Sequence, residues 1–172
     1  GGTTAGARNV ISGNANVGVK VNGLGTTGNL IQGNSIHSNG GLGIDLISAG
    51  VEGVTVNDSG DADSGPNNLQ NFPVLTTVFR GATPRVVGTL NSRPNETHTL
   101  DFYANTVADP SGFGEGERYL GSATVTTDGG GNASFDITLA TATSPTELIS
   151  ATATDATGNT SEFSGSLRPT VN

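Results

Sequence analysis

The densest group of side chains that could do chemistry lies in residues 57–65, which read NDSGDADSG. Carboxylates recur here at short spacing, and the glycines between them let the chain turn sharply. Carboxylate, amide and backbone carbonyl oxygens are the ligands that Ca²⁺ prefers, about six or seven at a time. The pattern therefore predicts a calcium loop, whose side-chain ligands would be Asp58, Asp61, Asp63, Asn57 and Asn67.

The acidic loop, residues 58–63, matches the calcium loop of an EF-hand only in part. No glutamate closes it, and no helix is predicted on either side of it. The alternative is a solvated linker whose Asp and Asn side chains form turns with their own backbone. If Ca²⁺ binds, its role would be to stiffen the connection between the parts of the chain on either side.

A second acidic group is formed by Asp155, Asn159 and Glu162. The spacing Asp-x-x-Gly-Asn is more typical of a hairpin turn, in which Asp155 caps its own backbone, than of a metal site. We therefore expect a turn at this position.

A third group lies in a glycine-rich loop and comprises Asp109, Glu115, Glu117 and Phe113. Loops on a rigid scaffold often carry binding function, and an aromatic ring beside carboxylates could contact a sugar. The interpretation that we favour is a long connection between strands that packs Phe113 onto a sheet.

The residue types give no support for catalysis. His37 and His98 stand far apart in sequence and outside any nucleophile–base motif, so we expect them at the surface or on strand faces. The chain has no cysteine, and no Gly-x-Ser-x-Gly elbow follows a strand and precedes a helix. Asp45 and Glu52 are the carboxylate pair that a polysaccharide-degrading enzyme would need, but too few repeats surround them to build a groove. We therefore predict that the chain is not an enzyme.

The composition favours strands and tight turns. Glycine supplies 27 of 172 residues, whereas charged residues make up only 13%. The net charge is -8 and there is no basic patch, which argues against nucleic acid as a partner. No apolar run is long enough to cross a membrane as a helix, so no membrane span is expected.

The first third of the chain contains an internal echo. Residues 9–14 recur at 29–34, displaced by 20, and residues 18–21 recur at 43–46, displaced by 25. A period in the twenties with asparagine and glycine corners is typical of a β-solenoid. Residues 1–56 are therefore expected to form a parallel β-helix segment of about two to three rungs. Its first strands would have exposed edges, which invite pairing with another chain. The inward side chains would be Ile11, Val19, Val21, Ile31, Ile36, Ile44 and Leu46.

The rest of the chain divides into a linker and a strand-rich part. Residues 57–73 show no apolar periodicity and are expected to be a linker, with Phe72 as an anchor into a core. Residues 74–172 contain about seven strand-like runs separated by turn residues, which fits an immunoglobulin-like (Ig-like) antiparallel sandwich. The fold class is thus predicted to be all-β. The expected strands are 74–79, 85–90, 98–104, 118–127, 133–139, 147–154 and 161–167.

Four stretches, together with the echo, carry a resemblance to known proteins. They read NNLQNFP at 67–73, DPSGFGEG at 109–116, YLGS at 119–122 and ATDATGNTSEFS at 153–164. The chain resembles a right-handed parallel β-helix repeat protein followed by a bacterial Ig-like domain, a combination of large exported surface proteins. The resemblance implies an extracellular or cell-surface setting and implies no reaction.

The residues and the resemblance together predict a non-catalytic structural or adhesive module. It would self-associate through its exposed end into a homo-polymeric filament, or adjoin neighbouring domains of a longer chain. The alternative is a carbohydrate-binding module for surface polysaccharide, or the remnant of a polysaccharide-degrading β-helix enzyme. Six Phe, two Tyr and no Trp leave few rings for an aromatic sugar platform.

Overall fold

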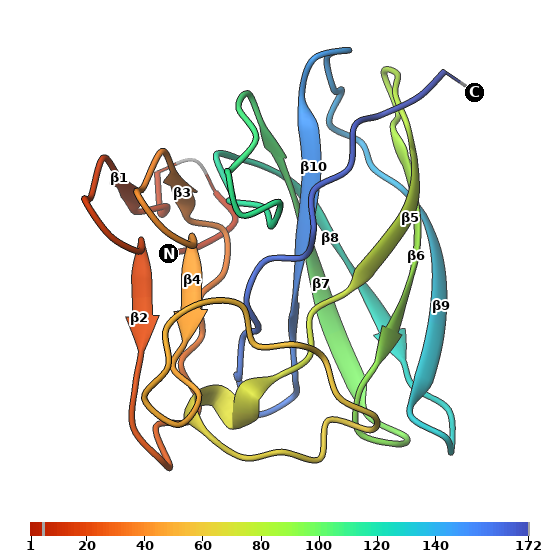
Figure 1. Ribbon diagram of the computed structural model, residues 1–172. Coiled ribbons are helices and arrows are strands. Elements are labelled where there is room, and N and C mark those ends of the chain that lie inside the picture. Colours follow the sequence, from red (N-terminus) through yellow and green to blue (C-terminus); the bar gives the residue numbers. More distant parts are fainter. Residues whose placement is uncertain (5, 172) are drawn as a thin grey trace.

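The structure, a computed structural model, describes residues 1–4 and 6–171 and consists mainly of strands (Figure 1). The first four strands are short: β1 (Val10–Ser12), β2 (Val19–Val21), β3 (Ser35–His37) and β4 (Ile44–Leu46). A 3₁₀ helix, η1 (Pro66–Leu69), precedes the longer strands. These are β5 (Val74–Phe79), β6 (Arg85–Asn91), β7 (Thr97–Asn105), β8 (Arg118–Thr126), β9 (Asn132–Thr138) and β10 (Leu148–Thr154).

The six longer strands form two antiparallel sheets, and we call these sheets, with the segments that connect and follow them, the antiparallel part. One sheet has the strand order β5-β6-β9 and the other the order β10-β7-β8. Apolar side chains from both sheets form one core, in which Phe102 meets Phe135 edge-on with ring centroids 6.0 Å apart. In β9 the buried Ala133 and Phe135 alternate with exposed neighbours, as period-two patterning requires. The prediction of an all-β fold with antiparallel sheets is confirmed.

The last expected strand, residues 161–167, does not form as a strand. The segment follows β10 through isolated bridges, such as the one between Leu167 and Ile149. The hydroxyls of Ser161 and Ser164 accept hydrogen bonds from the backbone N–H groups of Ala153 (2.9 Å) and Ala151 (3.0 Å). Side-chain oxygens thus take the place of the carbonyls that a regular ladder would use, because serine competes with the backbone for such bonds.

The predicted parallel β-helix is wrong, and so is the resemblance to β-helix repeat proteins. The first four strands, which we call the parallel part, form two separate two-stranded sheets, β1-β3 and β2-β4, and neither closes into a solenoid. Paired residues are 25 apart, as in Ile11–Ile36 and Val19–Ile44, so the echo displaced by 20 is not a strand pairing. Residues 28–34 hold no strand, because side chains from other segments bond their backbone instead.

A second apolar core joins the parallel part to the antiparallel part. The ring of Phe163 lies between Gly43 and Gly116, and a Cβ atom at either glycine would lie within 2.8 or 2.7 Å of that ring. Tyr103 packs edge-on against Phe163 with centroids 5.3 Å apart. Such close approach holds the two parts against each other. The buried members of this core are Val21, Ile36, Ile44, Leu46, Leu69, Tyr103 and Phe163.

Polar side chains complete the contact between the parts, and we call this set of acceptors the junction. Buried Glu162 accepts hydrogen bonds from the backbone N–H groups of Leu46 and Thr55, both at 2.9 Å. Buried N–H groups must be paired, so these side chains take the place of a further strand. The same role is played by Glu115 for Ser38 and Asn39, Asn159 for Gly28, Asn67 for Asn29, Thr160 for Ile31 and Tyr103 for Gly33.

Replacing Glu162 by alanine leaves the N–H groups of Leu46 and Thr55 without an acceptor. We expect Glu162→Ala to lower the free energy of unfolding by about 2–4 kcal/mol, because each buried unpaired group costs about 1–3 kcal/mol. Chemical denaturation at neutral pH measures the change. Glu52→Ala is the matched control, since the Glu52 side chain is 61% exposed and surface ion pairs contribute little. An equal loss in both variants would contradict the prediction.

Stability should also depend on pH through Glu162. Burial raises the pKa of Glu162 to about 7, although the hydrogen bonds from Leu46 and Thr55 oppose the shift. Because the folded pKa is the higher one, this carboxyl contributes stability that is complete below about pH 4 and lost as the pH rises through about 7. We expect the free energy of unfolding to rise as the pH falls from about 8 to about 6, and Glu162→Gln to flatten that rise. Denaturant midpoints of unfolding, measured across this pH range for the unsubstituted protein and for Glu162→Gln, test the prediction. Identical pH profiles for the two proteins would show that Glu162 is not responsible for the pH dependence.

Candidate metal centre

The acidic loop meets the antiparallel part at the end of β6. The backbone N–H of Gly60 donates to the side-chain oxygen of Asn91 at 2.7 Å. Asp58, Asp61 and Asp63 each offer a carboxylate oxygen, and these oxygens lie within 4.8 Å of one another. Across residues 1–4 and 6–171, no other group of three or more acidic, histidine or cysteine side chains gathers in this way. The three carboxylates that were predicted from their spacing thus form a cluster that could hold a metal ion.

Asp61 is fixed through both of its carboxylate oxygens. Its backbone is left-handed, with φ 52°, and the residue is 2% exposed. Oδ1 accepts from the backbone N–H of Asn71 at 2.9 Å, and Oδ2 accepts from the hydroxyl of Ser92 at 2.9 Å. Burial raises the pKa of Asp61 to about 6, although these two hydrogen bonds oppose the shift. Asp61 is therefore held in place by its neighbours before any ion binds.

Asp58 and Asp63 have weaker support from their neighbours. The Asp58 carboxylate accepts from the backbone N–H of Ala62 at 3.2 and 3.3 Å. Asp63 Oδ1 is buried and has no hydrogen-bond partner. Burial, and then the charge of Asp58, raise the pKa of Asp63. A buried charge without a partner is costly, so a cation among these three carboxylates would relieve an electrostatic penalty.

The two asparagines predicted as ligands bond to the backbone of other segments. Asn57 Oδ1 accepts from the Phe72 N–H at 3.0 Å, and Asn57 Nδ2 donates to the Phe72 carbonyl at 2.8 Å. Asn67 is 0% exposed; its Oδ1 accepts from the N–H of Asn29, and its Nδ2 donates to the carbonyls of Asn29 and Thr160. Both amides thus join segments of the chain, and backbone carbonyls or water would supply further oxygen ligands.

Sequence reasoning missed the side chains that position Asp61. The Ser92 hydroxyl lies 2.9 Å from Asp61 Oδ2 and 3.1 Å from His98 Nε2, and Gln70 Nε2 donates to the same hydroxyl at 3.0 Å. His98, expected at the surface or on a strand face, lies on β7 and is 0% exposed. Burial lowers its pKa, which favours the neutral ring. Ser92 and His98 are both buried, and no spacing in the sequence links them to the acidic loop.

The group around Asp155 forms a turn, as predicted. Asp155 Oδ1 accepts from the backbone N–H groups of Thr157 at 2.8 Å and Asn159 at 2.9 Å. Burial opposes the shift, but these hydrogen bonds and those from the side chains lower the pKa of Asp155. The third member, Glu162, belongs to the junction instead.

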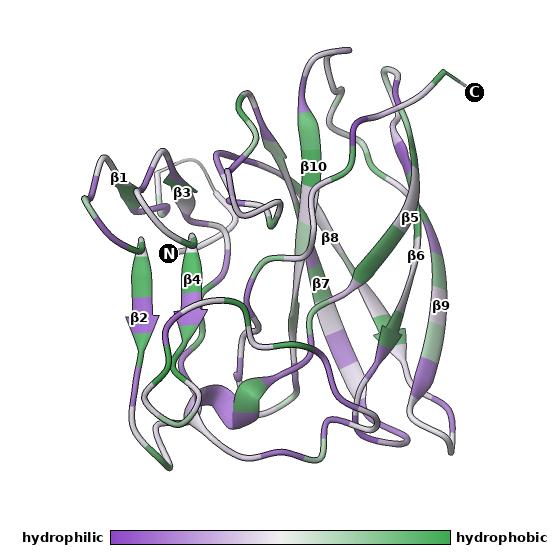
Figure 2. Cartoon of the chain, in the orientation of Figure 1, coloured by the Kyte–Doolittle hydropathy of each residue, from purple (hydrophilic) through white to green (hydrophobic). Residues whose placement is uncertain are grey.

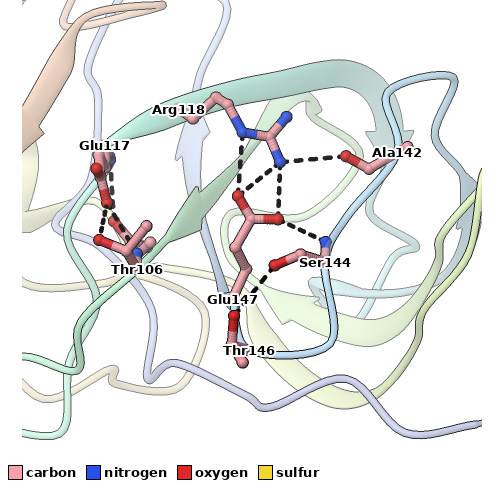
Figure 3. Close-up of polar contacts among 8 residues, drawn as sticks. Thr106, Glu117, Arg118, Ala142, Ser144, Thr146 and Glu147 are labelled. Atoms are coloured by element: carbon pink, nitrogen blue, oxygen red, sulfur yellow. Dashed lines mark hydrogen bonds and ion pairs between the residues drawn. The ribbon is translucent and has the colours of Figure 1, made fainter.

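The glycine-rich loop uses its carboxylates to bind its own chain. Glu117 accepts from the N–H and the hydroxyl of Thr106 at 2.8 and 2.7 Å, beside the pair of Arg118 and Glu147 (Figure 3). Phe113 packs edge-on against Phe72, with ring centroids 5.4 Å apart. Phe113 thus contacts Phe72 of residues 57–73 instead of a strand of a sheet, and Phe72, the expected anchor, is buried.

The carboxylate pair considered for polysaccharide cleavage lines a hollow of about 320 Å³ together with Asp109. Asp45 is 0% exposed, and its oxygens lie 3.3 and 3.4 Å from the backbone nitrogen of Gly53. Glu52 is exposed and forms an ion pair with Lys20. Burial raises the pKa of Asp45. The Asp45 carboxylate is therefore covered, whereas Glu52 is exposed and Asp109 is partly exposed, and we call these two residues the rim of the hollow.

Comparison with known proteins adds no family to these observations. A scan against models of protein families found no match, and a search of curated proteins found no similar sequence. In the part of the chain that the structure describes, no helix is long and apolar enough to cross a membrane. The site must therefore be interpreted from its own geometry.

When no metal is present, substitutions of the different cluster members should change the stability of the protein differently. In a chelator, Asp63→Asn removes a partly buried charge without a partner, so stability should stay equal or rise by up to about 1 kcal/mol. Asp61→Ala should lose about 1–3 kcal/mol, because Asn71 and Ser92 lose their acceptor. Denaturant unfolding compares the two. A loss in Asp63→Asn as large as that in Asp61→Ala would show that Asp63 has a structural partner.

Proposed function

We propose that this chain is a non-catalytic structural or adhesive module of an extracellular or cell-surface protein, and that Ca²⁺ bound at the acidic loop stiffens it. In this proposal residues 1–56 associate with neighbouring chains, and residues 57–73 hold the cation. Residues 74–172 form an Ig-like sandwich, which the two antiparallel sheets with a shared core support.

The observation that carries the proposal is the carboxylate cluster at the connection between the two parts. Three carboxylates converge within 4.8 Å, one of them with a buried oxygen that lacks a partner. Asp61 is anchored to Ser92, which follows β6, while Asn57 is anchored to Phe72, which precedes β5. A cation bound here would tie the acidic loop to the antiparallel part, which is a structural effect. Hard carboxylate and carbonyl oxygen ligands favour Ca²⁺ over metals that prefer nitrogen or sulfur ligands.

The surroundings of the other polar groups support a non-catalytic role. His98 and Ser92 are enclosed, and the buried carboxylates Glu115 and Glu162 are occupied by backbone N–H groups. A general acid or base must reach a substrate. These groups hold the chain together and are not free for that purpose.

Calcium should stabilise the protein measurably. At a free concentration of about 100 times Kd, Ca²⁺ should raise the free energy of unfolding by about 2.7 kcal/mol relative to a chelator. Mg²⁺ should give a smaller rise, because it loses its water reluctantly and demands octahedral geometry. Thermal unfolding in Ca²⁺, Mg²⁺ or chelator measures both effects. Asp63→Asn should abolish the response, whereas the exposed control Asp136→Asn should keep it; an unfolding temperature that ignores Ca²⁺ would reject the cation.

Self-association is part of the proposal and is supported by the free edges of the parallel part. β1 and β2 are each the outer strand of a two-stranded sheet. Large apolar side chains lie exposed around them: Val10 is 68%, Leu24 87% and Leu30 58% exposed. Free strand edges beside exposed apolar side chains favour pairing with another chain.

A carbohydrate-binding module is the second candidate, and the rim of the 320 Å³ hollow is the observation that favours it. Asp109 and Glu52 could accept hydrogen bonds from sugar hydroxyls, and Leu42 and Val54 supply apolar contact. Titration with neutral and acidic polysaccharides tests it. Saturable binding that Asp109→Asn weakens would favour this function over the structural one.

A further inference from the structure

β2 and β9 are edge strands that lie at opposite margins of the molecule, at the left and the right of Figure 1. Within the described residues, β2 pairs with β4 alone and β9 with β6 alone. An edge strand presents unpaired backbone N–H and C=O groups to another strand. In β2 these groups belong to Lys20, because the N–H of Val19 and the C=O of Val21 bond toward β4.

The two edges carry matching patterns of opposite charge. β2 reads Val19-Lys20-Val21, with a hydrophilic residue between two hydrophobic ones (Figure 2), and β9 contains the triplet 135–137, Phe-Asp-Ile. β2 already pairs with a triplet of this kind inside the molecule. Its partner β4 reads Ile-Asp-Leu, and Lys20 is the register partner of Asp45. In β9 the apolar side chains face the core and Asp136 faces solvent. A sheet that continued from β2 into β9 would keep its apolar residues on one side and place Lys20 beside Asp136.

The charge of the chain is divided unevenly along the sequence. Residues 1–44 contain Arg8 and Lys20 and no Asp or Glu, which gives +2. Residues 45–172 contain five Arg and all 15 acidic residues, which gives -10. Copies of an acidic chain repel one another in most orientations. An orientation that brings the Lys20 ammonium of one copy to the Asp136 carboxylate of another opposes this repulsion, and Lys20 then serves Asp136 as well as its neighbours Glu52 and Asp45.

Both charged side chains can accept a further partner. The side chain of Lys20 is 42% exposed beside Glu52, and that of Asp136 is 50% exposed beside Arg85. A carboxylate has about four lone-pair sites, so Asp136 can bind a lysine while it keeps Arg85. Beside β2 lies a hollow of about 700 Å³ that is lined by the apolar Val19, Val21, Leu30 and Ile31 and by polar residues such as Asn22.

We propose that β2 of one copy pairs with β9 of a second copy, with Lys20 beside Asp136. The contact joins two different surfaces, so every added copy leaves one free β2 and one free β9. Such a head-to-tail contact does not close on itself as a two-fold dimer does, and it builds an open filament. The inference rests on the proposed self-association and names the two surfaces that carry it.

Sedimentation equilibrium tests the contact on the full chain, from dilute solution up to about 1 mM, where weak interfaces become populated. The mean mass should grow past that of a dimer. Lys20→Asp should weaken association about tenfold, since it replaces attraction by repulsion across the strands. Asp136→Lys should do the same, and the double variant should recover much of the loss. Arg168→Asp is the matched control, because it changes the net charge as Lys20→Asp does at an exposed site away from both strands.

A competing peptide avoids any effect of the substitutions on folding. A capped peptide with the sequence of residues 132–138 should cover β2 and lower the mean mass, and the same peptide with lysine at position 136 should not. Growth that stops at a dimer, or growth that responds equally to Lys20→Asp and Arg168→Asp, would leave self-association intact and overturn the β2–β9 contact. A monomer at every concentration would overturn both.

Discussion

The fold depends on the supply of hydrogen-bond acceptors to buried backbone N–H groups where the parallel part meets the antiparallel part. Strands of three residues in two-stranded sheets cannot satisfy their own backbone. The junction solves this with side chains: two buried carboxylates, two amides and two hydroxyls, each aimed at N–H groups of the parallel part. The antiparallel part, together with Asn67 of η1, thereby acts as the missing neighbour.

The same constraint explains where the carboxylates of this acidic chain are buried. Glu162 and Asp61 each accept two hydrogen bonds, yet burial raises the pKa of both, so neither is fully compensated. Asp63 goes further, because one of its oxygens is enclosed with no donor at all. Buried carboxylates thus determine how the segments of the chain fit together, and burying their charge has an electrostatic cost. At the acidic loop a bound cation would reduce that cost.

Side-chain hydrogen-bond acceptors are distributed unevenly over the two margins of the parallel part. The inner margin has them, and over residues 1–4 and 6–171 the outer margin does not. On the inner margin, β4 and the residues after β3 end against Glu162 and Glu115. On the outer margin, β1 and β2 meet no side chain of this kind within the described residues. The inner margin is therefore closed by the fold itself, while the outer one remains available to another strand.

What the sequence determined by itself was local: alternation identified the antiparallel strands, as in β9, and short spacing identified the cluster of Asp58, Asp61 and Asp63. Both depend on neighbours in the chain. The tertiary structure decided the rest. The echo displaced by 20 suggested a rung, but Asn29 bonds to Asn67 and Gly28 to Asn159, which lies 131 residues away. A backbone N–H group without a strand partner bonds to whichever acceptor the folded chain brings near it. The periodicity of the sequence cannot predict acceptors that lie so far along the chain. For that reason the pattern indicated a solenoid where the molecule has two short sheets held by side chains of the antiparallel part and of η1.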